Sequence, residues 1–256
     1  MEHSTNYIVR FVVFMTVLVA LVLSLLSTSW KEKTLENEAI FNKRAILTSV
    51  ADYMDEDPKD MSEEKVLDIF ENKVEQIALD MKGNDLDADA IIKAGYKRGK
   101  PEHIDMKKEK KKEESTRIFP LYILNSDKGK VYITTVRGNG LWDEIWGNIA
   151  LKDDLSTVVG AAFGHKGETP GLGAEIKDNP TFPNQFKGKK IYNAAGEYTS
   201  VNVVKGGAKP GDINGVDGLS GATVTADGVD EMLDRGIRYY QPYFNKISKK
   251  VGATKG

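Results

Sequence analysis

Hydrophobic residues concentrate near the start of this chain. Residues 11–26 are apolar apart from Thr16 and Ser24, and continuing to Trp30 gives 20 positions. At about 1.5 Å per helical residue, this length crosses a hydrocarbon core of roughly 30 Å. The pattern predicts one transmembrane helix with Arg10 and Trp30 at the two interfaces. The alternative is a cleaved signal peptide, because residues 27–29 are small, although the apolar run exceeds a usual h-region of roughly 7–15 residues.

Residues 31–115 mix charged and apolar positions in a way that predicts helices. An irregular apolar series suits a helix that leaves the membrane, and it consists of Leu35, Ala39, Phe41, Ile46 and Val50. A second helix is predicted to begin near Asp60, with Glu63 three residues later as in a capping box. Its apolar face would hold Val66, Phe70, Val74, Ile77 and Met81. The charge run from Lys107 to Glu114 predicts a solvated loop.

After Arg117 the apolar period changes from helical spacing to that of strands. Residues 118–124 and 130–136 flank a turn-forming segment and predict a β-hairpin. Further strands are predicted near 145–151, 155–163 and 198–205, and a helix near 226–240, with a long irregular loop over 166–183. We therefore expect an α+β fold, a mainly antiparallel sheet with flanking helices, preceded by one N-terminal transmembrane helix. The expected division is an anchor over 1–30, a helical part over 31–115 and a ligand-binding domain over 116–256.

Composition narrows the chemistry. A net charge of −2 and a pI near 6.0 give no reason to expect nucleic-acid binding. The chain has no cysteine, which excludes disulfides and iron–sulfur ligation by its own thiolates, and its three histidines do not suggest a metal site. A redox role would therefore require a bound organic cofactor or a metal held by other ligands.

The segment Asp217–Thr225, D-G-L-S-G-A-T-V-T, places hydroxyls on a small-residue turn before a predicted helix. Glycines let the backbone approach an anion, and N–H groups at a helix N-terminus favour negative charge, so this turn can hold a phosphate. The structural alternative is that Ser220, Thr223 or Thr225 only caps the helix, and that Asp217 is only a turn residue.

A second motif, Gly164–Gly173, reads G-H-K-G-E-T-P-G-L-G and lies about fifty residues upstream. Together, H-x-x-E-T-P-G-L-G and D-G-L-S-G-A-T resemble the FMN-binding domain family shared by the C subunit of sodium-translocating NADH:quinone reductase and the G subunit of the Rnf complex. The chain length, G-L-W at 140–142 and I-W-G at 145–147 are more similar to the C subunit. The resemblance covers residue 138 to about 240 and, by layout, the anchor.

The resemblance implies a covalent flavin. In that family the last Thr of S-G-A-T carries FMN through a phosphoester, and the matching residue is Thr223. A Mg²⁺-dependent flavin transferase takes FMN from FAD and releases AMP. Asp217, Ser220, Gly221 and Ala222 match its recognition sequence. No metal held by the chain itself is expected.

The resemblance also indicates which residues surround the flavin ring. It places Glu168, Thr169, Leu172 and Gly173 there, with Trp142 and Lys205 as further candidates. The further candidates have structural alternatives: Trp142 could be a core aromatic, as could Trp146, and Lys205 could be a surface residue of a strand. His165 could likewise be only a loop residue.

The implied function is that of an electron-transfer subunit in a membrane complex that oxidises NADH, reduces quinone and exports Na⁺. Its partners would be the other subunits and the flavin transferase, and we expect no independent catalysis from this chain. Gly171-x-Gly173 lacks the third glycine of a dinucleotide motif, so NADH binding by this chain is not indicated. The alternatives are the Rnf G subunit, with ferredoxin as donor, or a membrane-anchored binding module without flavin.

The charge distribution and the family resemblance predict opposite orientations of the large domain across the membrane. Lys31, Lys33, Lys43 and Arg44 follow the apolar stretch and only Arg10 precedes it, so the positive-inside rule favours a cytoplasmic domain. The resemblance implies the periplasmic face of the bacterial inner membrane, and large domains translocate regardless of nearby charge. We expect a periplasmic domain.

Overall fold

The computed structural model describes residues 4–254, with side chains to residue 249. The chain divides into two compact units after Asn42. The first unit belongs to helix α1 (Thr5–Thr48), which runs without interruption through the predicted span. Its apolar stretch is long enough to cross a membrane, although a signal sequence meets the same criterion. The predicted helix is therefore confirmed.

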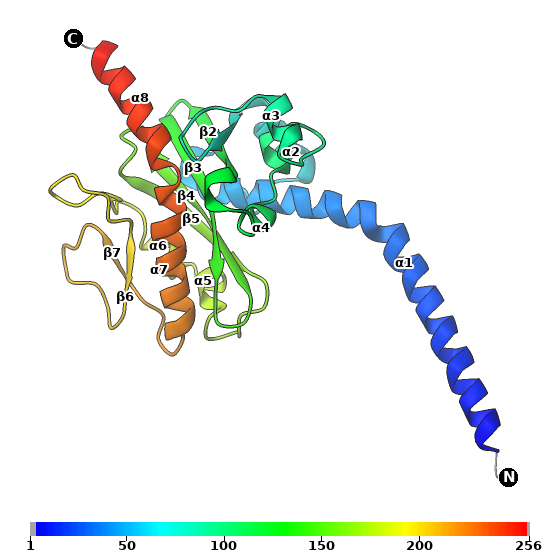
Figure 1. Cartoon of the computed structure of the whole chain (residues 1–256). Coiled ribbons are helices and arrows are strands. Elements are labelled where there is room, and N and C mark those ends of the chain that lie inside the picture. Colours follow the sequence, from blue (N-terminus) through cyan, green and yellow to red (C-terminus); the bar gives the residue numbers. More distant parts are fainter. Residues whose placement is uncertain (1–3, 255–256) are drawn as a thin grey trace. The chain divides into compact units, whose positions relative to one another are not determined.

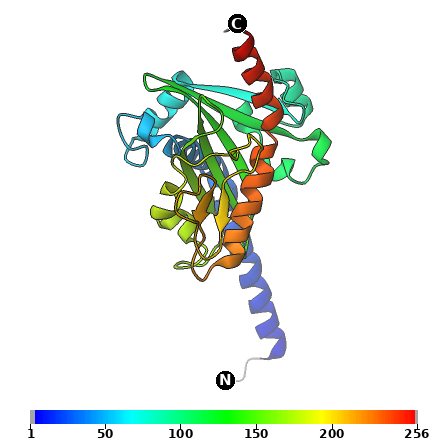
Figure 2. The ribbon, with the colours of Figure 1, turned by 90° about the vertical axis from the view of Figure 1, so that its left-hand side faces the viewer.

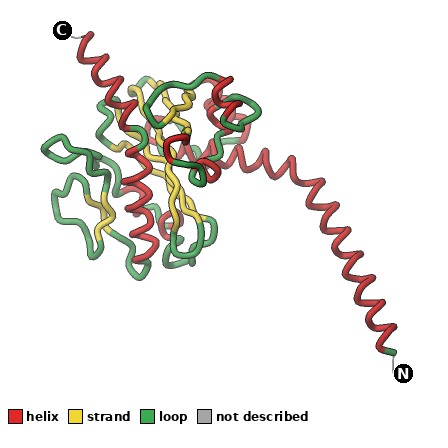
Figure 3. The backbone as a smooth tube through the Cα atoms, in the orientation of Figure 1, coloured by secondary structure: helices red, strands yellow, loops and turns green. Residues whose placement is uncertain are grey.

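The second unit is built on one five-stranded antiparallel sheet (Figures 1 and 3). Its strands follow one another in chain order, with each strand paired to the next. They are β1 (Val74–Asp80), β2 (Ile118–Ser126), β3 (Gly129–Asn139), β4 (Glu144–Lys152) and β5 (Val158–His165). The α+β prediction is confirmed, and so is the predicted hairpin, which is β2–β3.

Both faces of the sheet are covered. Along β2 the buried residues alternate: Phe119, Leu121 and Ile123 belong to one apolar cluster, while Tyr122 and Leu124 belong to another. This period of two is that of a strand between two packed layers. The first cluster lies under α7 (Thr223–Arg238), and the second lies under residues 46–70, which include α2 (Glu63–Asn72). Two-sided burial fixes the register, because a one-residue slip would exchange the two faces.

The helix predicted to continue to Met81 is wrong beyond Asn72. Ser62 caps α2 by accepting a hydrogen bond from the Lys65 N–H, so Asp60 is not the cap. Val74 and Ile77 lie on β1, which pairs with β2. Val74 and Ile77 are three positions apart, which is compatible with one face of a helix. In the structure both faces of this segment are buried, and a strand paired to the edge of the sheet satisfies that burial as well as a helix would. Residues 31–115 therefore contribute a strand to the sheet.

The prediction of a solvated loop over the charge run holds in part: most of its side chains are exposed, but residues 107–109 are helical and Glu109 is buried. Glu109, at the end of α4 (Met106–Glu109), is 1% exposed. Its carboxylate accepts hydrogen bonds from the Tyr96 hydroxyl and from the Ile118 N–H at 2.9 Å, and it pairs with Lys112 at 2.6 Å. A buried carboxylate is tolerated when it is fully paired in this way.

The remaining elements are short except at the C-terminus. They are η1 (Ala51–Tyr53), α3 (Ala88–Lys93), η2 (Pro101–His103), η3 (Glu114–Thr116), α5 (Glu175–Asp178), α6 (Thr181–Asn184), β6 (Asn202–Val204), β7 (Gly215–Asp217) and α8 (Gln241–Thr254). The strand predicted over 198–205 is reduced to β6, which pairs in parallel with β7 in a separate small sheet. The loop predicted over 166–183 contains α5 and ends within α6.

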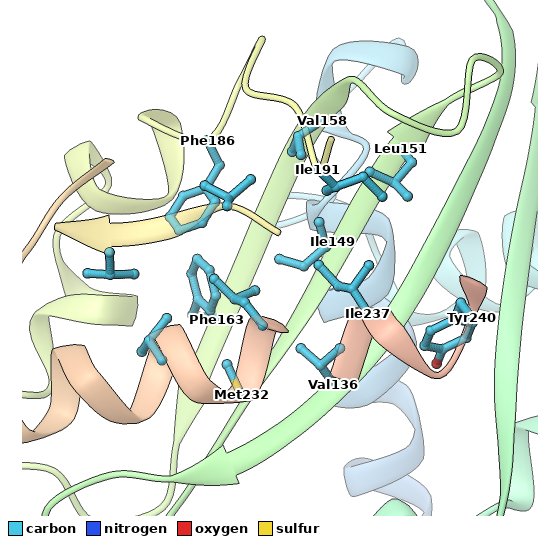
Figure 4. Packing of buried hydrophobic residues seen from close by; sticks show 14 of the residues in the cluster. Val136, Ile149, Leu151, Val158, Phe163, Phe186, Ile191, Met232, Ile237 and Tyr240 are labelled. Carbon is cyan, nitrogen blue, oxygen red and sulfur yellow. The ribbon is translucent and has the colours of Figure 1, made fainter. Parts of the chain in front are cut away.

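Helix α7 packs on the sheet along β3 (Figure 4). Glycines allow the helix and the sheet to approach closely. A Cβ at Gly228 would stand 2.1 Å from the carbonyl oxygen of Asn139, and one at Gly236 would stand 2.5 Å from Val136. Met232 and Ile237 fill the space between helix and sheet. This packing places the first turn of α7 at the end of the sheet where α5 lies (Figures 1 and 2).

Candidate functional site

The turn between β7 and α7 carries the S-G-A-T sequence, and Asp217 fixes its start. The Asp217 carboxylate accepts a hydrogen bond from the Ala208 N–H at 2.8 Å, and its own N–H donates to the Gln185 side chain at 2.8 Å. Gly221 adopts φ +74°, a conformation that favours glycine. The turn is therefore held by its backbone and by Asp217, and its hydroxyls are not needed to form it.

No side-chain hydroxyl caps helix α7. Its N-cap is Ala222, which offers no side-chain acceptor. The interpretation of Ser220, Thr223 or Thr225 as the cap is therefore wrong. The N–H groups of residues 223–225 have no partner within the helix by geometry, and they lie at the positive end of its dipole. The N-terminus of α7 is thus available to an anionic group.

Thr225 is engaged elsewhere. Its side chain is buried, and its hydroxyl donates to Glu168 Oε2 at 2.5 Å. The Glu168 carboxylate also accepts the Trp142 N–H at 3.0 Å and lies 3.3 Å from the Leu141 N–H. One carboxylate therefore joins the loop after β3, the loop after β5 and the first turn of α7. We refer to this carboxylate and its four donors, the Thr225 hydroxyl and the N–H groups of Leu141, Trp142 and Asp143, as the Glu168 junction.

The Glu168 junction is built for an ionised carboxylate. Burial acts to raise the pKa of Glu168, but the hydrogen bonds from Thr225 and the backbone N–H groups outweigh it, and the pKa is lowered. A Cβ at Gly140 would lie 2.5 Å from Oε1, and one at Gly173 would lie 2.4 Å from Oε2. The two glycines thus make room for the carboxylate. His165 Nδ1 accepts the Glu168 N–H at 3.2 Å, so His165 orients this residue from the end of β5.

Two pockets meet at the S-G-A-T turn. A pocket of about 540 Å³ lies beside β6, and its wall includes Lys205, Ser220 and Leu219. A pocket of about 190 Å³ lies on the other side of the turn, and its wall includes Leu141, Leu172 and Val224. Gly221 and Thr223 are part of both walls. A group attached to the Thr223 hydroxyl would therefore have access to both pockets.

The structure brings most of the predicted site residues together. Ala222, Glu168, Thr169, Leu172 and Gly173 line the smaller pocket, and Ser220 and Lys205 line the larger one. Lys205 is exposed and forms no ion pair with any described residue. Trp142 lines neither pocket, and at 70% exposure it is not a core aromatic. Its indole N–H donates to Thr169 Oγ1 at 3.1 Å, which places it at the rim of the smaller pocket.

Trp146 is part of the packing of the sheet. The Arg137 guanidinium lies 5.4 Å from its ring centre, and the ring passes over Gly164 of the neighbouring strand. Trp146 is not among the residues lining the two pockets.

Sequence reasoning missed three features of the site. Leu141 and Val224, each 54% exposed, form apolar walls of the smaller pocket, and Thr225 is the buried partner of Glu168. No local signal marks the Glu168–Thr225 contact, since the two residues are 57 positions apart. Leu141, Leu172 and Val224 are all exposed around one turn, and this clustering can be recognised only in the folded structure.

The arrangement suits a phosphorylated ligand with a flat apolar part. The helix N-terminus and the glycine-rich turn suit the phosphate, and the exposed leucines and Val224 suit the ring. Among the described residues, no group of three His, Cys, Asp or Glu side chains could hold a metal ion.

Comparison with known proteins identifies the class of this site. Residues 140–238 match the model of the FMN-binding domain. The chain is 32% identical to the C subunit of the Na⁺-translocating NADH-quinone reductase of Vibrio anguillarum, over 95% of its own length and 97% of that protein. It is 34% identical to the corresponding C subunit of Pseudomonas aeruginosa, over 85% of its length and 88% of the relative.

A solved structure shares the fold. The crystal structure of the C subunit from Parabacteroides distasonis matches with a TM-score of 0.69 at 33% identity, covering 83% of this chain and 96% of that one. The chain therefore belongs to the family of C subunits of the Na⁺-translocating NADH-quinone reductase, and it contains an FMN-binding domain.

Proposed function

We propose that this chain is an electron-carrying subunit of a membrane-bound, Na⁺-translocating NADH:quinone reductase, with FMN attached through a phosphoester to Thr223. The observation that carries the proposal is the position of Thr223. It is the hydroxyl residue shared by the walls of the two pockets, and its hydroxyl makes no hydrogen bond to any described residue. Thr225 is buried and bonded to Glu168, while Ser220 faces only the larger pocket.

The attachment requires a separate enzyme. A threonine hydroxyl is a weak nucleophile, and it reacts when an activated phosphoryl donor is presented to it. With FAD as donor, the Thr223 oxygen forms a bond to the phosphorus of the FMN half while the phosphoanhydride bond breaks. AMP leaves, and the hydroxyl proton is lost. A flavin transferase is thus a maturation partner, and the exposed Ser220–Gly221 turn gives it access.

The residues around Thr223 would contact different parts of the attached FMN. The first-turn N–H groups of α7 bind the phosphodiester, and Leu141, Leu172 and Val224 form the apolar wall for the ring. Lys205 offers a cation in the adjoining pocket, which stabilises a reduced, anionic ring when the ring reaches it. FMN, when bound, takes up and passes on electrons singly, and the NADH, quinone and Na⁺ steps belong to the assembled complex.

The proposed location of the chain is the bacterial inner membrane. Residues 11–26 of α1 would anchor it there, and the FMN-binding part, within 116–256, would lie in the periplasm. The remaining subunits of the complex are its expected partners.

Intact mass tests the attachment. The full chain is expressed with and without a flavin transferase, as wild type and as Thr223→Val, which removes the oxygen but keeps the branched shape. We expect flavin mass and in-gel fluorescence only in wild type with the transferase.

Two control variants identify the oxygen. Ser220→Ala removes an exposed hydroxyl from the same turn, and Thr225→Val removes the hydrogen bond to Glu168. Both should retain the flavin, although Thr225→Val should be less stable by about 1.5–3 kcal/mol, the worth of a hydrogen bond to a charged group. Flavin retained in Thr223→Val, or lost only in Thr225→Val, would assign the bond to another hydroxyl. Loss in Ser220→Ala alone would point to the transferase recognition sequence, and Ser220→Thr, which keeps a hydroxyl, distinguishes the two explanations.

A further inference from the structure

The segment over residues 93–112 carries a charge opposite to that of the rest of the chain. It contains nine Lys or Arg against three Asp or Glu, a net of +6, so the other residues carry −8. Even with Glu113 and Glu114, which follow directly, the segment keeps a net of +4. A local excess of positive charge of this kind favours association with an anionic partner.

These residues form one compact lobe, which we call the basic lobe. Ile91, Tyr96 and Ile104 pack on Ala78 and Ile118 of the sheet. Lys112 Nζ donates to the carbonyl oxygen of Ala94 at 2.9 Å and lies 5.3 Å from the centre of the Tyr96 ring. These contacts hold the two ends of the segment together, so its charges are presented by one folded body.

The three carboxylates of the basic lobe are used internally. Glu102 pairs with Lys43 at 2.8 Å, Asp105 caps α4, and Glu109 is buried against Lys112. Five outward cations have no carboxylate partner among the described residues, namely Lys93, Lys97, Arg98, Lys100 and Lys111. The exposed Lys107 and Lys108 lie 4.0 Å from Glu144 and 3.8 Å from Asp105. Ile92 stands beside Lys93 with 48% of its surface exposed. Exposed cations with an apolar neighbour are the composition of a surface that binds anionic headgroups.

We propose that the basic lobe docks on the anionic lipid surface of the membrane that holds this chain. The inference rests on the proposed anchoring by α1. Sixteen residues separate Leu26, at the end of the apolar stretch, from Lys43, where the second unit begins. A tether this short keeps the second unit at high effective concentration near the bilayer. Weak attraction by each exposed cation is then sufficient to hold the lobe at the surface.

The experiment uses the full chain in lipid nanodiscs. The chain has no cysteine, so a single introduced one gives a unique label. Ser115→Cys, exposed at the edge of the basic lobe, carries a fluorescent donor, and Ala195→Cys, exposed in the 193–197 turn, is the reference position. Acceptor lipid is placed in discs of phosphatidylcholine alone or with about one third phosphatidylglycerol. Energy transfer reports the approach of each label to the bilayer.

Two variants are matched in charge. The first neutralises four lobe lysines: Lys93→Gln, Lys97→Gln, Lys100→Gln and Lys111→Gln. The second neutralises four exposed lysines elsewhere: Lys177→Gln, Lys190→Gln, Lys209→Gln and Lys249→Gln. We expect transfer at Ser115→Cys to rise on anionic discs and to fall by about half or more in the lobe variant. The second variant should match wild type. About 1 M salt, where the Debye length is about 3 Å, should abolish the rise.

The outcomes separate docking from anchoring. Co-elution of the chain with the discs reports the anchor, and its failure would count against the proposed membrane span and not against the lobe. Equal transfer on neutral and anionic discs, or an equal loss in both four-site variants, would overturn the docking proposal. So would a response that appears only when the other subunits of the complex are added, since that outcome assigns the basic lobe to an acidic protein partner.

Discussion

Replacing Glu168 tests whether the Glu168 junction holds the flavin site in shape. Glu168→Gln keeps the size of the side chain but removes its charge, and Glu168→Ala removes the acceptors. The two shortest bonds come from the Thr225 hydroxyl at 2.5 Å and the Trp142 N–H at 3.0 Å. A hydrogen bond to a charged group is worth about 1 kcal/mol more than a neutral one, so we expect Glu168→Gln to cost about 2 kcal/mol. Glu168→Ala leaves the buried Thr225 hydroxyl and the part-buried Trp142 N–H unpaired and should cost about 4 kcal/mol.

Thermal unfolding of the full chain in detergent measures both costs. For a domain of about 150–250 residues, 1 kcal/mol shifts Tm by about 2–4 °C. We therefore expect a fall of about 4–8 °C for Glu168→Gln and about 8–16 °C for Glu168→Ala. Glu175→Gln is the matched control, because the Glu175 carboxylate makes no hydrogen bond or ion pair with any described residue.

The same variants predict a pH dependence with a definite sign. The pKa of Glu168 is lowered from an ordinary value of 4.5, so its stabilising contribution is complete above that value and is lost as the pH falls through the lowered pKa. The difference between wild type and Glu168→Gln should therefore shrink below about pH 4.5. A constant difference at all pH values, or Glu168→Ala no less stable than Glu168→Gln, would refute the reasoning.

Three further predictions address the ring pocket, the helix packing and the topology. Leu172→Ala should shift the flavin spectrum or potential without changing the flavin mass, and an unaltered spectrum would remove Leu172 from the ring wall. Gly228→Ala places a Cβ 2.1 Å from a carbonyl oxygen and should cost about 1–3 kcal/mol by thermal melting. At Gly167 the added Cβ would have no described atom within 4 Å beyond its chain neighbours, so Gly167→Ala should leave the stability unchanged. Protease added to spheroplasts should digest the chain after about Trp30, and full protection of the domain would support the cytoplasmic orientation instead.

The sequence by itself determined the features that depend on local periods and local motifs. The length of the apolar run in residues 11–26 requires a long helix whatever it packs against. The alternation around residues 125–129 specifies the β2–β3 hairpin, because turn chemistry and strand period act over a few residues. The S-G-A-T and G-H-K-G-E-T-P-G-L-G segments are likewise local motifs, and their resemblance to the FMN-binding domain family indicated the position of the site.

Tertiary structure decided what depends on contacts between distant residues. Val74–Asp80 forms a strand because it pairs with the edge strand β2 and both of its faces are buried. The local spacing of its apolar residues does not distinguish a helix from a strand. Glu109 is buried because Tyr96 and Ile118 supply donors that its own charged segment does not. Thr225 became the partner of Glu168, and not a helix cap, because α7 packs closely enough on the sheet to bring them together. Only that packing distinguishes the free hydroxyl of Thr223 from the engaged one two residues later.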